Sequence, residues 1–233
     1  ITLDSCRGPT AVSTAGSKGR GEARAAGLAS AGANLVLVSR NEAEAKATAA
    51  RVAEEYGCQA LGFAAAVSSQ ADMEAMTSAA LDALGQVDIL INSAGINTRG
   101  PIDELSYEQF AEVQRINVDG IWLACRAVLP HMKQQKWGRI INIGSEVFHL
   151  GVKPFTAYVA AKGGQNGFNR SLAHEVAEGN ITVNRIAPGW IPGERHEKDP
   201  QELKDGYLAS IPMGRWGVPR GPYLCLLYTS PSP

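Results

Sequence analysis

Short apolar runs alternate with helix-like segments along most of the chain, and this alternation constrains the fold more than any other feature. The apolar runs lie at residues 10–13, 34–39, 60–65, 87–91, 139–143 and 181–186. Three of them, LVLV, VDILI and RIINI, are apolar on both faces, as is typical of strands buried between two helical layers. Strands that alternate with helices in this way join through right-handed βαβ units. The sequence therefore predicts an α/β fold, a doubly wound parallel sheet in a single domain.

Capping patterns mark where two of the intervening helices begin. Asn41 is followed three residues later by Glu44, and Ser106 is followed by Gln109 at the same spacing. Both pairs match the capping box, in which two side chains satisfy the free backbone N–H groups of a first helical turn. From the second pair we predict one long helix over residues 106–135.

Charge and cysteine content exclude several classes of protein. The chain has 22 Lys and Arg against 23 Asp and Glu, so it offers no basic surface for nucleic acid. Its apolar runs are too short to cross a membrane, and no secretory leader is recognisable. Its four cysteines form no CxxC pair, which argues against a disulfide framework or a metal site. We therefore expect a cytoplasmic protein with no nucleic-acid or membrane partner.

A glycine-rich turn follows the first predicted strand. Its residues of interest are Thr14, Gly16, Ser17, Lys18, Gly19 and Gly21. Glycines at such a turn let the backbone approach a pyrophosphate at the N-terminus of the next helix. An ordinary flexible loop between strand and helix has the same composition, so this turn alone leaves dinucleotide binding open.

The residue after the second predicted strand bears on the choice of dinucleotide. Arg40 lies where a site that prefers NAD would place an acidic residue for the ribose 2′-hydroxyl. An arginine there, together with Lys18, could hold a 2′-phosphate by charge-assisted hydrogen bonds. Solvated surface charges would look the same, but the shared location favours NADP, with NAD as the alternative.

Four polar residues have a spacing that chance does not readily produce. Tyr158 and Lys162 are one helical turn apart and therefore share a helix face. By composition alone about 0.2 such pairs are expected in this chain. Ser145, just past the RIINI run, and Asn117, in the predicted long helix, reduce the chance of the full set to roughly 0.0005.

With these residues in place, the chain resembles the short-chain dehydrogenases/reductases, in particular members that act on 3-oxoacyl thioesters or on sugars and polyols. The resemblance runs from about Ala11 to Pro219 and implies a Rossmann-type sheet. It implies that Asn117, Ser145, Tyr158 and Lys162 form the catalytic set. It also adds cofactor-lining positions to the glycine-rich turn and Arg40, namely Asn92, Ala94, Gly95, Tyr158, Lys162, Pro188, Gly189 and Ile191.

The residue types suit ketone and alcohol chemistry. A free tyrosine phenol has a pKa of about 10, and a nearby Lys162 ammonium would lower that pKa. Tyr158 would then give a proton to the developing alkoxide in reduction and take it back in oxidation, while Ser145 holds the substrate oxygen. Lys162 could also bind the nicotinamide ribose. The resemblance implies that Asn117 holds a water of the proton relay and that the chain forms a homo-oligomer.

Several positions depart from the family pattern. Ala15 replaces a glycine, Ala66 an acidic residue and Gly193 a threonine. Polar residues stand where apolar ones are usual, namely Arg20, Arg24, Gln165, Asn166 and Asn169. An unpaired guanidinium between a strand and a helix is costly, so Arg20 and Arg24 count against a well-formed loop.

The last residues of the chain do not continue the pattern. The resemblance stops at Pro219 and implies a dinucleotide-binding domain over residues 1–219, whereas the segment 220–233, RGPYLCLLYTSPSP, has no helical or strand period. We expect this tail to be non-native and the last strand of the sheet to be missing. Three outcomes stay open: an NADP(H)-dependent oxidoreductase acting on a small carbonyl or alcohol, a non-catalytic dinucleotide-binding relative, and an incomplete, inactive product.

Overall fold

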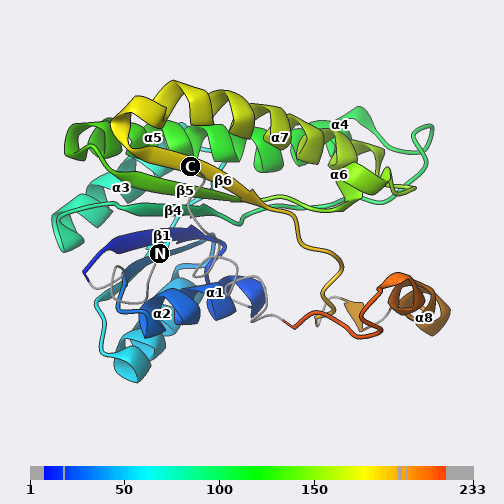
Figure 1. The fold of residues 1–233 in the computed structure, drawn as a ribbon, viewed down its shortest axis with the longest axis horizontal. Helices are drawn as coiled ribbons and strands as arrows, with labels where there is room; N and C mark the ends of the chain where they lie inside the picture. Colours follow the sequence, from blue (N-terminus) through cyan, green and yellow to red (C-terminus); the bar gives the residue numbers. More distant parts are fainter. Residues whose placement is uncertain (1–7, 18, 194–195, 198, 219–233) are drawn as a thin grey trace.

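The strands of the computed structural model form one parallel sheet (Figure 1). The structure describes residues 8–17, 19–193, 196–197 and 199–218, with Arg20 described by its backbone alone. In these residues the sheet has six strands in the order β3-β2-β1-β4-β5-β6. The strands are β1 (Thr10–Thr14), β2 (Asn34–Ser39), β3 (Ala60–Ala64), β4 (Ile89–Asn92), β5 (Gly138–Ile143) and β6 (Ile181–Ile186). The predicted doubly wound parallel sheet is thus confirmed.

The fourth strand begins later than the predicted run 87–91. Asp88 lies just before β4, and its carboxylate accepts the backbone N–H of Thr10 at 2.7 Å. The Asp88 backbone N–H still donates to the Thr10 carbonyl at 2.9 Å, but the Asp88 side chain takes the place of its backbone as the acceptor, and the strand starts only at Ile89.

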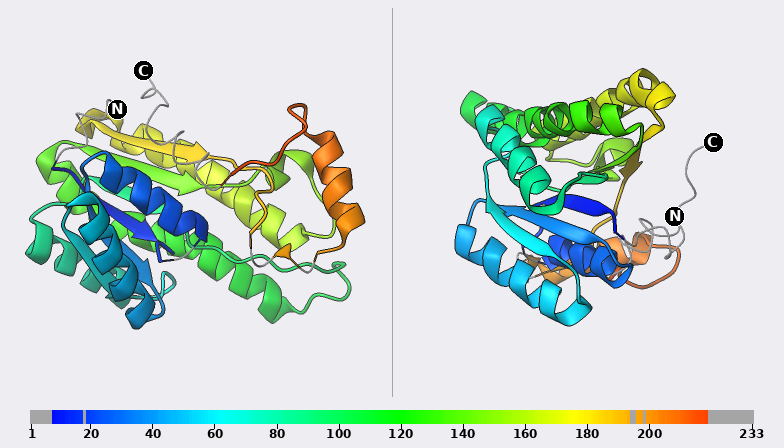
Figure 2. Two further views of the ribbon diagram at one scale, coloured as in Figure 1. Left: turned by 90° about the horizontal axis from the view of Figure 1, so that it is seen from below. Right: turned by 90° about the vertical axis from the view of Figure 1, so that its left-hand side faces the viewer.

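Helices cover both faces of the sheet and produce three layers (Figure 2). On one face lie α1 (Gly19–Ser30) and α2 (Glu42–Tyr56). The opposite face is covered by α3 (Gln70–Leu84), α5 (Gly120–Gln135) and α7 (Thr156–Val176), with α4 (Tyr107–Gln114) beside α7. The short elements are η2 (Arg115–Asp119), α6 (Val147–Leu150) and η3 (Ala177–Gly179). Only α8 (Gln201–Ser210) stands away from the sheet (Figure 1).

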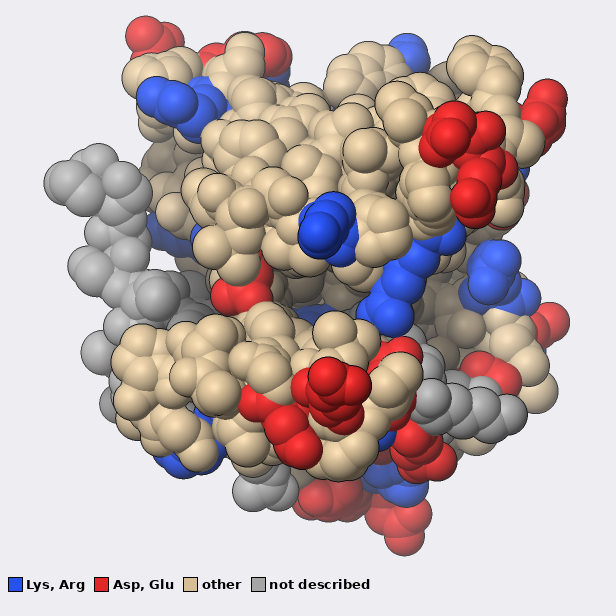
Figure 3. Space-filling view, turned by 90° about the vertical axis from the view of Figure 1, so that its right-hand side faces the viewer, with Lys and Arg blue, Asp and Glu red and all other residues tan. Residues whose placement is uncertain are grey.

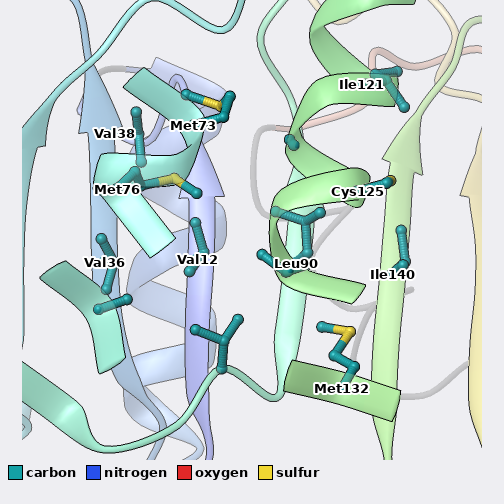
Figure 4. Close-up of a cluster of buried hydrophobic side chains, with 14 of the residues drawn as sticks. Val12, Val36, Val38, Met73, Met76, Leu90, Ile121, Cys125, Met132 and Ile140 are labelled. Atoms are coloured by element: carbon teal, nitrogen blue, oxygen red, sulfur yellow. The ribbon is translucent and has the colours of Figure 1, made fainter. Parts of the chain in front are cut away.

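Alternate residues of each central strand enter different cores. Val12, Val36 and Leu90 pack beneath α3 and α5 against Met73 and Ile121, as Figure 4 shows. Their strand neighbours, including Leu35 and Ile89, pack against α1 and α2. Because side chains alternate across a strand, a run that is apolar at every position suits a sheet buried on both faces.

The predicted long helix over 106–135 is interrupted. Ser106 caps α4 with the predicted capping box to Gln109, but residues Arg115–Asp119 form a π turn before α5 begins. Such insertions are rare and are often found at functional sites. This one carries Asn117, which is fully buried.

The strand order reverses direction between β1 and β4, whose following helices, α1 and α5, cover opposite faces. In open α/β sheets, ligands bind at the carboxyl ends of the strands beside such a switch point.

Within the described residues, no helix is both long and apolar enough to span a membrane. The tail 220–233 and Lys18 lie outside those residues, so the expectations about them stay predictions.

Candidate active site

A cavity of about 840 Å³ lies at the carboxyl ends of β4, β5 and β6. The loops after these strands form its inner wall, and α8 forms its outer wall. Figure 3 shows the molecule hollowed between the helical body and the segment that carries α8, with Lys and Arg atoms within and beside the hollow. The cavity is large enough for a cofactor and a small substrate.

Three of the four predicted catalytic residues line this cavity. Ser145 follows β5, and Tyr158 and Lys162 project from the first turns of α7. The Lys162 Nζ lies 5.3 Å from the centre of the Tyr158 ring and donates a hydrogen bond to the Ile143 carbonyl at 2.8 Å. Helix α7 packs along β6, so residues that are distant in sequence meet at one edge of the sheet.

Burial alters the ionisation of Lys162. The side chain is only 3% exposed, and this burial is the main reason that its pKa falls to about 7. The positive charge of Arg185 lowers the pKa further. A group with a pKa near neutrality can exchange a proton readily at the pH of a cell.

The fourth predicted residue, Asn117, lies behind the cavity wall in the π turn. Its Nδ2 donates to the carbonyls of Ile96 at 2.8 Å and Val113 at 2.9 Å. Its Oδ1 is buried and has no hydrogen-bond partner among the described residues. A Cβ added to Gly95 would come within 2.6 Å of this oxygen, so glycine is needed where the cavity wall passes Asn117.

Gln165 connects this turn to the lysine, a link that the sequence did not reveal. Its Oε1 accepts from the Lys162 Nζ at 3.1 Å, and its Nε2 donates to the Asn117 carbonyl at 2.6 Å. Gln165, a polar residue at a usually apolar position, therefore has hydrogen-bond partners for both its amide oxygen and its amide nitrogen. Asn169 has one as well, because its Oδ1 accepts from the Nδ2 of Asn142.

The glycine-rich turn is attached to the end of β4. The Thr14 Oγ1 accepts the backbone N–H groups of Ser93 at 2.9 Å and Ala94 at 3.1 Å. A Cβ at Gly21 would come within 1.8 Å of the Ala15 carbonyl oxygen, so α1 packs directly on the turn. Arg24 of α1, only 3% exposed, lines the cavity and donates to the Ser93 Oγ. The expected cost of burying Arg24 is thus offset by a hydrogen bond.

The backbone conformation of Ala15 predicts that replacing it with glycine stabilises the fold. Its φ is +53°, a left-handed conformation that costs an L-residue about 1–2 kcal/mol. Ala15→Gly relieves that strain but adds chain entropy to the unfolded state, so we expect a net gain of about 0.5–1 kcal/mol. The unfolding midpoint should rise by about 1–4 °C in a calorimetric scan. Ala173→Gly, in α7, is the control and should lower the midpoint.

The structure brings only some of the predicted cofactor residues to the cavity surface. Those in its lining are Gly95, Tyr158, Lys162, Pro188 and Gly189. Outside the lining are Thr14, Gly16, Ser17, Gly19, Gly21, Arg40, Asn92, Ala94 and Ile191. Asn92 is 2% exposed, and its Nδ2 donates to the Asn142 Oδ1 at 2.8 Å, so its side chain joins neighbouring strands.

Aromatic side chains hold α8 over the cavity. The Tyr207 hydroxyl donates to the Glu146 carboxylate and accepts the Trp190 backbone N–H at 2.7 Å. Its ring stacks on Trp216 at 5.6 Å between centroids. Burial and the hydrogen bond to Glu146 raise the pKa of Tyr207 to about 12. Glu146, the residue after Ser145, thus joins the loop after β5 to α8 at the cavity lining.

The chain is similar in sequence and in fold to known proteins. The sequence model of the short chain dehydrogenase family matches residues 9–203. The 3-oxoacyl-acyl-carrier-protein reductases FabG of Aquifex aeolicus and Vibrio cholerae are 34% and 36% identical over 213 residues, covering 91% of this chain and 86% of each relative. A crystal structure of an NAD⁺-bound xylitol dehydrogenase superposes with a TM-score of 0.90 at 28% identity, covering 95% of this chain and 92% of the other.

The family match covers well over half of the chain, and it falls on the sheet, the glycine-rich turn and the helix that carries Tyr158 and Lys162. Relatives at about 35% identity extend over nearly the whole chain. The chain therefore belongs to the short-chain dehydrogenase/reductase family of oxidoreductases.

Proposed function

We propose that this chain interconverts a ketone and a secondary alcohol with NADP(H), using Ser145, Tyr158 and Lys162 as catalytic residues and Asn117 as their support. The observation that carries the proposal is the convergence of Ser145, Tyr158 and Lys162 on one cavity from two separate segments. A hydroxyl, a phenol and a cation within one cavity suit proton transfer to and from a substrate oxygen.

The residues around the cavity fit a nicotinamide dinucleotide. Close packing requires glycine at Gly16, Gly21 and Gly95, because Cβ atoms added there would contact protein atoms at 3.0, 1.8 and 2.6 Å respectively. The glycine-rich turn is therefore held compactly at the carboxyl edge of the sheet, where a dinucleotide binds in folds of this kind. The N-terminus of α1 faces the same edge of the sheet and suits a pyrophosphate. The residues proposed to hold the cofactor are Thr14, Gly16, Ser17, Lys18, Gly19, Gly21, Arg40, Asn92, Ala94, Gly95, Tyr158, Lys162, Pro188, Gly189 and Ile191.

In the proposed mechanism, the protein moves a proton and stabilises charge on the substrate oxygen. The bound cofactor supplies or accepts the hydride. Tyr158 gives its phenolic proton to the oxygen of a ketone that is being reduced, and the Ser145 hydroxyl donates a hydrogen bond to that oxygen. Lys162 stabilises the tyrosinate that results, and Gln165 together with the Ile143 carbonyl keeps its Nζ in place.

Arg40 supports NADP rather than NAD. It is exposed and follows directly after β2, at the edge of the sheet where the glycine-rich turn lies. A guanidinium there can form two charge-assisted hydrogen bonds to a 2′-phosphate, and NAD has no such group. The xylitol dehydrogenase of similar fold was crystallised with NAD⁺, so the preference needs a direct test.

We expect Arg40→Asp to reverse the cofactor preference. The substitution removes the partner of the 2′-phosphate and adds a repelling carboxylate, so the KM for NADPH should rise at least tenfold while the KM for NADH falls. Steady-state kinetics with both cofactors measures this change. Lys133→Asp, at an exposed position on α5, is the matched charge reversal and should change neither KM. An unchanged ratio in Arg40→Asp would remove the argument for NADP.

For the substrate, the FabG relatives support a 3-oxoacyl thioester, and the structural neighbour supports a sugar or polyol as the second candidate. NADPH oxidation measured with 3-oxoacyl thioesters, sugar ketones and simple ketones distinguishes the two. Cofactor binding without turnover of any compound would favour a non-catalytic dinucleotide-binding protein instead.

We also propose that the chain forms the homo-oligomer that the resemblance implies. The exposed aromatic side chains of Phe110 on α4 and Trp122 on α5 support this proposal.

A further inference from the structure

Arg185 occupies a core position on the last strand of the described sheet. Side chains alternate along β6, so Ile181, Val183 and Arg185 share one face. Ile181 and Val183 are buried in the core with residues of α5 and α7. The third position on this face carries a partly buried guanidinium instead, at the end of the strand that borders the cavity. A charge in that place is costly unless several partners satisfy it.

Partners from two other segments hold the guanidinium. Its Nη1 donates to the Asn166 Oδ1 at 2.9 Å, and its Nη2 donates to the Ser145 carbonyl at 3.0 Å. Its Cζ lies 5.5 Å from the centre of the Phe148 ring, within the range of a cation–π contact. Arg185 therefore connects α7, the loop after β5 and α6 directly behind Ser145.

Gly144 provides the space that this arrangement needs. A Cβ added to Gly144 would come within 2.0 Å of the Arg185 Nε, so only a residue without a side chain lets the guanidinium lie against the backbone before Ser145. Asn166 thus accepts a hydrogen bond from the Arg185 guanidinium, and Gly144 leaves the space in which that guanidinium lies. Their agreement indicates a specific arrangement and not a surface arginine that happens to fold inward.

We propose that Arg185 is a positioning residue of the catalytic centre, one that fixes the backbone of Ser145 and places a second positive charge near Tyr158. The inference rests on the proposed function, since it assigns Arg185 a part in the same reaction. Arg185 donates to the backbone of Ser145 and is not part of the cavity lining, so it acts through Ser145 and Tyr158.

The electrostatics of the cluster support a need for this second charge. Burial brings the pKa of Lys162 to about 7, so its ammonium is partly lost near neutral pH. A guanidinium stays protonated throughout this range. Burial lowers the pKa of Arg185, and the negative charge of an ionised Tyr158 acts against that lowering. Arg185 therefore keeps a cation near the phenol when Lys162 is neutral.

Other ionisable groups lie on the elements around the cluster. Tyr158 and Lys162 belong to α7, Glu146 to the loop after β5, and His149 to α6. The Glu146 carboxylate is hydrogen-bonded to the Tyr207 hydroxyl of α8. These residues are the same in every variant compared below, but the pKa of Lys162 also depends on the positive charge of Arg185, so a change between variants reports the net effect of Arg185 on the cluster.

The test is a spectroscopic titration of the Tyr158 phenol, taken as the ultraviolet difference between each protein and its Tyr158→Phe counterpart. We expect Arg185→Met to raise the apparent pKa of Tyr158 by about one unit, because a nearby cation favours phenolate. The acid limb of the pH profile for alcohol oxidation should move up by the same amount. Arg185→Lys should keep the phenol titration near that of the unsubstituted protein while lowering kcat, because a lysine restores the charge without the guanidinium's two-sided hold on Ser145 and Asn166.

Arg139→Met is the matched control, since Arg139 is also partly buried but lies at the other end of β5, where it donates to the Asn180 carbonyl. It should leave the Tyr158 titration unchanged. An unchanged titration in Arg185→Met overturns the proposal even if ketones are reduced. A shifted titration without turnover of any ketone supports it while the proposed function fails. If Arg185→Met does not fold, Asn166→Leu decides, because it frees the guanidinium: a raised phenol pKa supports the proposal, and an unchanged one overturns it.

Discussion

Tyr158→Phe is expected to lower the rate of ketone reduction by about 10²- to 10⁴-fold, the usual contribution of a positioned general acid. The substitution removes one hydroxyl and keeps the ring, so the contact with the Lys162 Nζ at 5.3 Å and the tilted packing on Phe155 can both persist. The proton for the substrate oxygen then has to come from a group that is less well placed. Binding of the cofactor should weaken far less than the rate falls, because Tyr158 loses only its hydroxyl while Lys162 and the glycine-rich turn are unaltered.

Single-turnover reduction and cofactor titration separate these two expectations. Tyr56→Phe, at the end of α2 and away from the cavity, is the matched control and should keep full activity. A Tyr158→Phe protein that reduces ketones at the original rate would show that another group donates the proton, and the assignment of Tyr158 would have to be abandoned.

Gly21→Ala is expected to cause the second large loss, this time in cofactor binding. An added Cβ would lie 1.8 Å from the Ala15 carbonyl oxygen, a backbone atom that cannot rotate away. Helix α1 must therefore move off the turn that we propose for the pyrophosphate. A displacement of about 1 Å in a positioning element can cost about 100-fold in rate, and overpacking of this kind costs about 1–3 kcal/mol of stability.

Titration of the variant with NADPH, together with a thermal unfolding scan, measures both losses. Gly167→Ala in α7 is the matched control, because an added Cβ there meets no atom within 4 Å. It should bind the cofactor normally and melt at the same temperature or higher, since alanine favours helix. Normal binding by Gly21→Ala would place the cofactor elsewhere than at this turn.

Local pattern was sufficient to predict most of the fold. The strand predicted over 34–39 has the observed bounds because it is apolar on both faces and ends at polar residues. The π turn could not be predicted, because the sequence from 106 to 135 has a continuous helical period. That turn depends on contacts outside the helix, including the hydrogen bond from the Asn117 side chain to the Ile96 carbonyl. Tertiary contacts of this kind leave no periodic signal.

The candidate site likewise contains residues that could be predicted from the sequence and residues that could not. Ser145, Tyr158 and Lys162 could be grouped in advance, because their joint spacing is rare by chance and resembles that of the short-chain dehydrogenases/reductases. Tyr207 could not, since its partner Glu146 is 61 residues away and no motif joins them. Gln165 was recognisable only as a polar residue at a usually apolar position, and nothing in the sequence pattern singled out Arg185. Which groups they satisfy became clear from the folded arrangement alone.

The central claim is that a hydride passes between a nicotinamide cofactor and a carbonyl carbon in the cavity that holds Tyr158. Its most direct test is reduction of a panel of ketones with NADPH deuterated at the transferable position, followed by mass spectrometry of the alcohols. We expect one deuterium on the carbinol carbon of the product, and a large loss of labelled product with Tyr158→Phe. Tight cofactor binding with no label in any alcohol, or labelling that Tyr158→Phe leaves undiminished, would contradict the account.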